Sequence, residues 1–325
     1  MNLRIALTSL AALATFTIAL ADPRVLTLVS DSGDLTGLSL IHRIDSKTGQ
    51  YQGAIGGLYL NHAGAIASCT EYYNVKTVNT RVYVADDYGI KNFNVVTGVY
   101  NGMIPYNNQG KAIAMCFGSC RVTAQNNYLS DPDLFVVFQT DALHYKVRRY
   151  DALTGALLVE SAPVNALLSG PVSITCSYGN IDVMYGSSIY SCDDIFTGNA
   201  SFQQKPVLSS HTTLSAMDAG DYRTNSGLFM RVLSNGEMRG GIGHLNGGIH
   251  VGWLAPGNYA GTIAGSEFHD TEVLTNVNAM LITLTDYNAS YGYVSQTTYP
   301  LYSTFKHGTL RGIAHYADPK LYNVW

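Results

Sequence analysis

Charged residues are scarce in this sequence, and that scarcity excludes several classes of protein. Of 325 residues, 13% are charged and 46% are hydrophobic, and 19 Lys and Arg stand against 23 Asp and Glu, for a net charge of −4. Disordered chains show the opposite balance, with high charge and low hydrophobicity. A nucleic-acid-binding domain needs a local excess of basic residues, which is absent here. We therefore expect a folded chain without a nucleic-acid partner.

Long apolar runs are also missing, except at the N-terminus. Arg4 precedes an apolar segment over residues 5–20, and Ala19-Leu20-Ala21 fits the small-x-small pattern of a signal-peptidase site. We predict that residues 1–21 are a signal peptide and that residues 22–325 are secreted, to the periplasm or the cell exterior, with no membrane span left. The alternative, an uncleaved anchor, requires a longer apolar run.

What the sequence does contain is a repeated phrase of Asp or Asn, two variable residues, and Thr-Gly. It recurs about every 40–60 residues, a spacing typical of propeller blades. An Asp or Asn side chain can bond the backbone two residues on, and Gly accepts the positive φ that reverses the chain, so each phrase predicts a hairpin turn. The four copies span residues 43–49, 92–98, 149–155 and 192–198.

Short segments of small and β-branched residues also repeat, and they fit strands that pack close to an axis. They span residues 65–69, 112–116, 172–176 and 312–316. An apolar strand follows in several units, at residues 81–85, 133–138, 228–232 and 280–284. The first unit lacks its small inner strand, and residues 312–316 can supply it from the other end of the chain.

These patterns predict an all-β chain that forms a single β-propeller of six four-stranded blades, with seven as the alternative. Strands from both termini would close the ring, which leaves no open sheet edge around it. The arrangement resembles the superfamily of β-propeller repeat proteins, especially those with NHL-like and quinoprotein-like repeats. The resemblance covers nearly all of residues 22–325, and its shared motif is a structural turn that implies the fold and no particular activity.

Candidate functional residues are few. Smaller propellers such as the gluconolactonase-like hydrolases, which this chain resembles in size, hold a metal on the axis with Glu, Asn and Asp oxygens that suit Ca²⁺. The residues that could take this role here, near the expected inner strands, are Glu71, Asp218, Glu272, Asn276, Asn278 and His315. Ordinary loop-solvating and turn-forming roles explain the same residues more simply, so we expect no catalytic group and no cofactor, with Ca²⁺ as the alternative.

Cysteines and glycosylation patterns give weaker signals. Outside the cytosol, Cys116 could pair with Cys120, and Cys176 with Cys192 across a hairpin, although the spacing does not fix the connectivity. Asn199 and Asn288 each begin an Asn-Ala-Ser acceptor pattern for glycosylation.

The 23 tyrosines have two interpretations: exposed faces for sugar or protein contacts, or strand residues that pack across a sheet.

Three functions follow from the sequence. The first is a secreted or cell-surface propeller that binds a protein, a glycan or its own copies without catalysis. The second is a hydrolase or lyase of the gluconolactonase-like kind with an axial Ca²⁺. The third is a subunit of an extracellular filament or surface layer.

Overall fold

The computed structural model of the chain is built almost entirely of antiparallel strands. It describes residues 25–45, 49–68, 80–118, 133–165, 172–177, 180–185, 188–192, 201–205, 214–219, 228–233, 237–242, 249–253, 260–265, 270–275, 281–287, 293–300 and 307–317. Over these residues there are 25 strands and one short 3₁₀ helix, η1 (Gly57–Tyr59). None of the helices in these ranges is long and apolar enough to cross a membrane.

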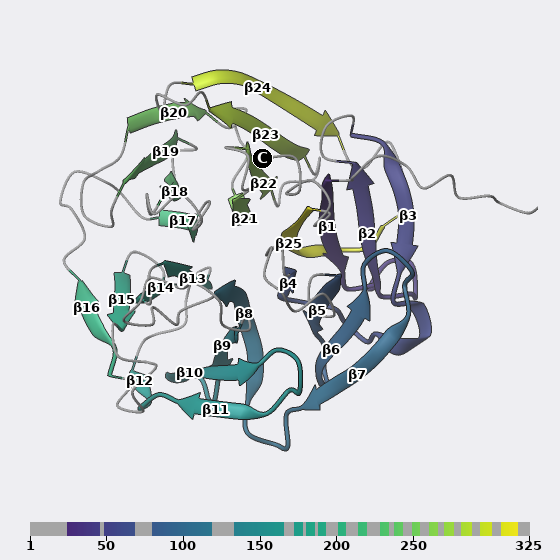
Figure 1. Cartoon of the computed structure of the whole chain (residues 1–325), viewed down its shortest axis with the longest axis vertical. Coiled ribbons are helices and arrows are strands. Elements are labelled where there is room, and N and C mark those ends of the chain that lie inside the picture. The colour runs from purple at the N-terminus through teal and green to yellow at the C-terminus, as the bar shows by residue number, and fades with distance from the viewer. Residues whose placement is uncertain are drawn as a thin grey trace, which may run out of the picture.

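The described strands form six sheets, each with a simple up-and-down order from the centre outward (Figure 1). The first, joined from both ends of the chain, consists of β25 (Leu310–Ala317), β1 (Val25–Asp31), β2 (Leu40–Asp45) and β3 (Tyr51–Ile55). The second consists of β4 (Ile66–Ser68), β5 (Arg81–Ala85), β6 (Gly89–Asn94) and β7 (Tyr100–Pro105). The third consists of β8 (Lys111–Gly118), β9 (Asp133–Gln139), β10 (His144–Asp151) and β11 (Leu157–Glu160), with β12 (Val164–Asn165) also paired to β10.

The remaining three sheets follow the same order. They are β13 (Val172–Ser177), β14 (Asn180–Tyr185), β15 (Ser188–Cys192) and β16 (Gln203–Lys205); β17 (Leu214–Ala219), β18 (Leu228–Leu233), β19 (Glu237–Ile242) and β20 (Ile249–Trp253); and β21 (Ala260–Gly265), β22 (Asp270–Thr275), β23 (Leu281–Tyr287) and β24 (Tyr293–Pro300).

The first strand of each sheet lies nearest the centre, and each contacts the first strand of the next sheet, from β4 through β8, β13, β17 and β21 to β25 and back to β4. The small-residue segments predicted as inner strands therefore take that position. One expectation is wrong: residues 281–287 form the third strand of their sheet, and β22 is the second. Both segments are apolar and β-branched, so the local pattern does not distinguish them.

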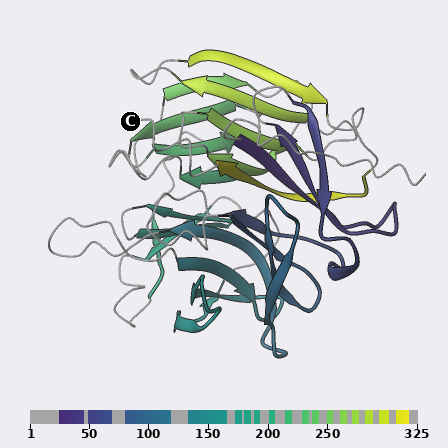
Figure 2. The same cartoon turned by 45° about the vertical axis from the view of Figure 1, so that its right-hand side comes forward.

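The pairing between the two ends of the chain is as predicted. β25 runs antiparallel to β1, with Leu28 opposite Ala314 and Thr27 opposite His315 (Figure 2). In a propeller each sheet has an inner strand. Here the inner strand of the first sheet is β25, the last strand in the sequence.

Three of the Thr-Gly phrases lie between the third and fourth strands of their sheets, between β2 and β3, β6 and β7, and β10 and β11. In the second sheet the Asn94 Oδ1 accepts hydrogen bonds from the backbone N–H groups of Val96 and Thr97 at 2.9 and 2.8 Å. Gly98 follows with a φ of 75°, and its N–H donates to the Asn94 carbonyl at 2.8 Å. Because an Asx turn and a left-handed Gly together reverse the chain, the sequence determines this turn locally. The phrase at residues 192–198 lies largely outside the described residues.

The hydrophobic core lies between neighbouring sheets. One cluster joins the β25–β1–β2–β3 sheet to the β4–β7 sheet, a second joins the latter to the β8–β11 sheet, and a third joins β8–β11 to β13–β16. Bulky side chains of second strands fill these layers, such as the fully buried Tyr83, Phe135 and Phe138. Face-to-face packing of twisted sheets leaves the connecting loops exposed at the two ends of the strands, where function is usually found.

Candidate functional site

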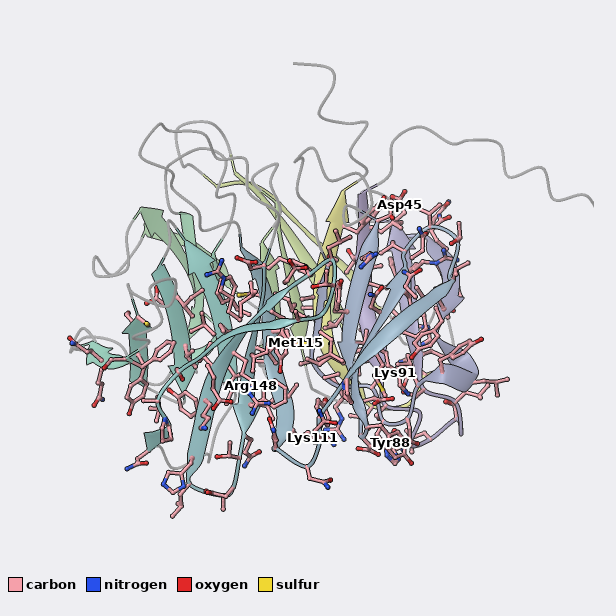
Figure 3. All side chains as sticks on the ribbon, turned by 60° about the horizontal axis from the view of Figure 1, so that its bottom comes forward. Asp45, Tyr88, Lys91, Lys111, Met115 and Arg148 are labelled. Atoms are coloured by element: carbon pink, nitrogen blue, oxygen red, sulfur yellow. The ribbon has the colours of Figure 1, made fainter. Side chains whose placement is uncertain are left out.

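The loops gather at two opposite ends of the strands. Figure 3 shows Tyr88 and Lys111 at one end and Asp45, at the start of a Thr-Gly hairpin, at the other. Because neighbouring strands are antiparallel, the β1–β2, β3–β4, β5–β6, β7–β8 and β9–β10 connections and residues 307–309 all share the first end. We call it the Tyr88 end.

Asp87 is the centre of a charged network at the Tyr88 end. Its Oδ2 accepts a hydrogen bond from Asn61 Nδ2 at 2.8 Å and lies 2.5 Å from His62 Nδ1, while its Oδ1 accepts one from Lys111 Nζ at 2.7 Å. Burial raises the pKa of Asp87, but the hydrogen bonds from Lys111 and His62 outweigh burial and leave the pKa below its usual value. The carboxylate therefore stays charged and holds an exposed imidazole and an exposed ammonium in fixed positions.

The neighbouring Asp86 builds the turn that carries this network. Its Oδ1 accepts the backbone N–H groups of Tyr88 and Gly89 at 2.9 and 3.1 Å. Its Oδ2 lies 2.5 Å from Lys91 Nζ, and the same ammonium sits 5.6 Å from the centre of the Tyr88 ring. The buried Asp86 thus fixes a turn that displays Tyr88, with a cation beside its ring.

Tyr106 lies beneath this network, and its buried hydroxyl has no acceptor for its hydrogen among the described residues. Its side chain is buried, with the ring edge-on to Phe138. Burial raises the pKa of Tyr106 well above its usual range, and the nearby charges of Asp86 and Asp87 act in the same direction. The phenol therefore remains protonated and provides an unused donor beneath the carboxylates.

Exposed apolar side chains also lie at the Tyr88 end. Leu58 is 97% exposed and Leu35 is 80% exposed. Both stand on turns closed by backbone hydrogen bonds, from Gly37 N–H to the Gly33 carbonyl at 2.8 Å and from Tyr59 N–H to the Gly56 carbonyl at 3.0 Å. The other exposed apolar residues at this end are Leu38, Tyr59, Tyr88 and Leu143. These side chains are presented on ordered turns, so a partner that buries them has little backbone freedom to restrict.

The charges at this end are of both signs. Besides Asp87 and Lys111, the end holds Asp141, which accepts hydrogen bonds from His144 Nδ1 at 2.8 Å, and Asp34. The hydroxyl and N–H of Thr309 lower the pKa of Asp34 to about 2. The described residues of this end thus combine exposed apolar side chains with charged groups of both signs, and they create no field of one sign.

A second polar cluster lies inside the first sheet. Asp31, at the end of β1, accepts N–H groups of Gly33 at 2.9 Å and of Gly308 at 2.9 and 3.0 Å to its two oxygens. Its Oδ2 also lies 3.0 Å from His42 Nε2, and both residues are fully buried. The carboxylate thus links the end of β1 to residue 308, just before β25 begins. Asp31 is buried because these two segments and His42 pack around it.

Of the predicted metal ligands, three lie on described strands. Asp218 is on the inner strand β17 and His315 on the inner strand β25, whereas Glu272 is on the second strand β22, opposite Ala264 of β21. Glu272 therefore lies next to the inner strand β21 and not on it. Glu71, Asn276 and Asn278 lie outside the described residues. Within the ranges that the structure describes, no group of three or more His, Cys, Asp or Glu side chains could hold a metal ion.

The sheet register bears on one expected disulfide. Cys176 and Cys192 both lie opposite Ile181, on either side of β14. Two strand spacings separate them by about 9–10 Å, beyond the roughly 7 Å that a disulfide spans between Cα atoms. The register therefore argues against this pair, while Cys116, half-buried on β8, has its proposed partner Cys120 outside the described residues. The acceptor residues Asn199 and Asn288 also lie outside them.

Sequence reasoning missed the network around Asp87. Its members come from three separate segments, the β3–β4 connection, the β5–β6 turn and β8, so only the fold brings His62 and Lys111 to one carboxylate. The one local signal was Asp86-Asp87-Tyr88-Gly89, an Asx-type turn that carries more charge than turn formation requires.

In comparisons with known proteins, no protein family and no curated protein matches this sequence. Solved structures are similar in fold. A protein of unknown function from Bacteroides caccae has a TM-score of 0.57 and 10% identity, over 90% of this chain and 99% of that one. TolB from Acinetobacter baumannii has a TM-score of 0.55 and 10% identity, over 90% of this chain and 66% of that one. A candidate 6-phosphogluconolactonase from Bacteroides uniformis has a TM-score of 0.53 and 11% identity, over 86% and 83%. These neighbours are of the propeller type, and at such identities they establish a propeller-like fold alone.

Proposed function

We propose that this chain is a secreted six-bladed β-propeller, closed by strands from both ends, that binds a partner protein through its Tyr88 end without catalysis. The blade number and the closure rest on the six sheets, the contacts between successive inner strands and the pairing of β25 with β1. Secretion rests on the signal-like pattern of residues 1–21.

The observation that carries the binding function is the pair of leucines, Leu35 and Leu58, held almost fully exposed on ordered turns at one end. Single exposed leucines are common on protein surfaces, but these two stand on loops of the same sheet, with Tyr59 and Tyr88 at the same end. Protein–protein interfaces combine apolar and aromatic side chains with polar groups, as this end does.

A protein fits this surface better than a glycan or a lipid bilayer. Sugar sites rely on flat aromatic faces with convergent polar groups, whereas the most exposed side chains here are aliphatic. A surface that binds anionic lipid carries a net positive charge, and here Asp34, Asp87 and Asp141 offset the cations. Each of these three carboxyl groups has a pKa below its usual value and stays ionised at neutral pH.

The experiment is site-specific photo-crosslinking in the cells that make the protein. A photoreactive amino acid replaces Leu58, or replaces Leu153 at the opposite end as the matched control. We expect one discrete protein adduct from position 58 and none from position 153. The captured protein, once purified, should bind the Leu35→Ser variant about 10–100 times more weakly than the unaltered chain, because each buried leucine contributes about 1.5–3 kcal/mol.

The control variant Leu153→Ser should bind normally. Equal adducts from both positions, no adduct at position 58, or unchanged affinity of the Leu35→Ser variant would each overturn the proposal. An adduct with a second copy of the chain would identify the partner as the protein itself.

A further inference from the structure

A line of hydrogen-bonding groups crosses the first sheet from its interior to its outer strand. It runs from Asp31 on β1 through His42 on β2 to Tyr51 on β3. His42 Nε2 lies 3.0 Å from Asp31 Oδ2, and His42 Nδ1 lies 3.3 Å from the Tyr51 hydroxyl. Asp31 and His42 are fully buried, whereas Tyr51 is 37% exposed. The line therefore joins a buried carboxylate to a phenol that solvent can reach.

The surroundings of Asp31 determine which nitrogen of His42 carries the proton. Burial raises the pKa of Asp31, but hydrogen bonds from His42, Gly33 and Gly308 outweigh it and hold the pKa below the usual value. Asp31 is therefore a carboxylate, which can only accept hydrogen bonds. The hydrogen in its bond with His42 is thus carried by Nε2 of the imidazole. In the neutral imidazole the Nδ1 atom is then an acceptor, and the Tyr51 hydroxyl donates to it.

This arrangement gives Tyr51 a proton acceptor that a phenol in water lacks. If the Tyr51 proton moves to Nδ1, the imidazolium that forms stands beside the Asp31 carboxylate, which stabilises it as the carboxylate does in a Ser-His-Asp triad. The other charged group near the phenol is Arg43, whose guanidinium lies close enough to lower the Tyr51 pKa against the larger effect of burial.

We propose that Tyr51 is the site at which this protein undergoes one-electron oxidation most readily among its described tyrosines, with His42 as the proton acceptor. A peroxide-activated haem peroxidase takes the electron, and the hydroxyl proton passes to His42 Nδ1, which leaves a neutral tyrosyl radical. The inference is independent of the proposed binding function.

Two such radicals can couple through a new bond between ring carbons ortho to the oxygens, and the displaced ring hydrogens restore the hydroxyls. The two phenols together lose two electrons and two protons, and one hydrogen peroxide takes them up to give two waters. β3 is the outermost described strand of its sheet (Figure 1), and Tyr51 on this strand is 37% exposed, so a phenol of another molecule can approach its ring. Tyr51 is thus a modification and cross-linking site.

Exposure alone predicts a different outcome, which makes the proposal testable. Tyr88 is 63% exposed, and the ammonium of Lys91 lies beside its ring. Tyr51, in contrast, has the imidazole of His42 at its hydroxyl. Tyr59 is also more exposed than Tyr51 and stacks on Tyr100 at 4.6 Å between ring centres. If accessibility governed oxidation, Tyr88 would react first.

The experiment treats the folded chain at neutral pH with a haem peroxidase and substoichiometric hydrogen peroxide, followed by peptide mapping. General-base assistance typically contributes at least about 100-fold, and allowing for the lower exposure we expect Tyr51 to be modified at least about tenfold faster than Tyr88. Dityrosine fluorescence should fall severalfold in the Tyr51→Phe variant and stay unchanged in Tyr88→Phe. Faster modification of Tyr88, or equal dityrosine yields in the two variants, would overturn the proposal.

The His42→Gln variant tests the proton acceptor itself. Glutamine can still donate to Asp31 but is a far weaker base, so Tyr51 should lose its advantage over Tyr88 while circular dichroism shows an intact fold. Retained selectivity in a folded His42→Gln protein would show that His42 is not the acceptor. If that variant does not fold, the competition between Tyr51 and Tyr88 in the unaltered chain decides the proposal.

Discussion

Arg43 offers the sharpest test of how neighbouring sheets hold together. It lies on β2, and its Nη1 donates to the Val95 and Val96 carbonyls of the next sheet's Thr-Gly hairpin, both at 3.0 Å. Its Nη2 donates to the Gln52 carbonyl within its own sheet at 3.2 Å. Arg81 of β5 reaches the equivalent carbonyls of the following hairpin, Ala152 and Leu153, at 3.3 and 3.1 Å. The guanidinium therefore links one sheet to the turn of the next.

The perturbation is Arg43→Met, which keeps most of the aliphatic stem and removes the donors. A hydrogen bond to a charged group contributes about 1.5–3 kcal/mol when the acceptor cannot be rehydrated. Val95 is buried, so loss of its bond should cost an amount in that range, whereas Val96 is exposed and water can replace its bond. Because Arg43 is itself only half-buried, we expect a total loss of about 2–3 kcal/mol of unfolding free energy.

Urea unfolding of the purified chain measures this loss, with the exposed Arg311→Met as the control, for which we expect less than about 0.5 kcal/mol. Hydrogen exchange should show faster exchange at the amides of residues 95–98 in the Arg43→Met variant. A loss below about 0.5 kcal/mol, or unchanged exchange in that hairpin, would refute the idea that the guanidinium fastens the turn.

Four further predictions concern the ends of the chain, the thiols and metals. Asp31→Asn should destabilise the protein at neutral pH. Because the folded-state pKa of Asp31 is lowered, the stabilisation by its carboxylate is present above about pH 4 and is lost as the pH falls further. The difference in melting temperature between the variant and the unaltered protein should therefore shrink with acid, and a constant difference would contradict this. Mass spectrometry of the unreduced, digested protein should find no peptide that joins Cys176 to Cys192, since two strand spacings separate them. EDTA should leave the melting temperature unchanged, and a fall of several degrees would favour the axial Ca²⁺ alternative over the proposed function. N-terminal sequencing of the protein recovered from the producing cells should begin at Asp22, and retention of Met1 would exclude cleavage of the predicted signal peptide.

Much of the fold could be predicted from the sequence because its signals are local. An Asn or Asp followed by Thr-Gly encodes a hairpin through its own side chain and a glycine at positive φ, and Asn94 and Asp151 both make those bonds. The small inner strands were identified for a similar reason, since crowding near the centre restricts side-chain size. Residues 281–287 were placed in the wrong strand position because every outer strand has a similar apolar pattern.

The candidate site could not be predicted, because no local pattern encodes it. The sequence directed attention to residues around the expected inner strands, yet Glu272 lies on a second strand. The Asp87 network and the Asp31–His42–Tyr51 line depend on which loops and strands become neighbours. Asp31 ends β1, and its buried role appears only once residue 308 lies against it.

The sequence by itself determined the strands, their turns and the repeat that arranges them, because each of these depends on residues only a few positions apart. Tertiary structure alone decided that His62 and Lys111 meet at Asp87, and that Leu35 and Leu58 remain uncovered at the same end. The physical reason is that contact between distant segments follows from the packing of whole sheets, whose energy is shared among many buried side chains.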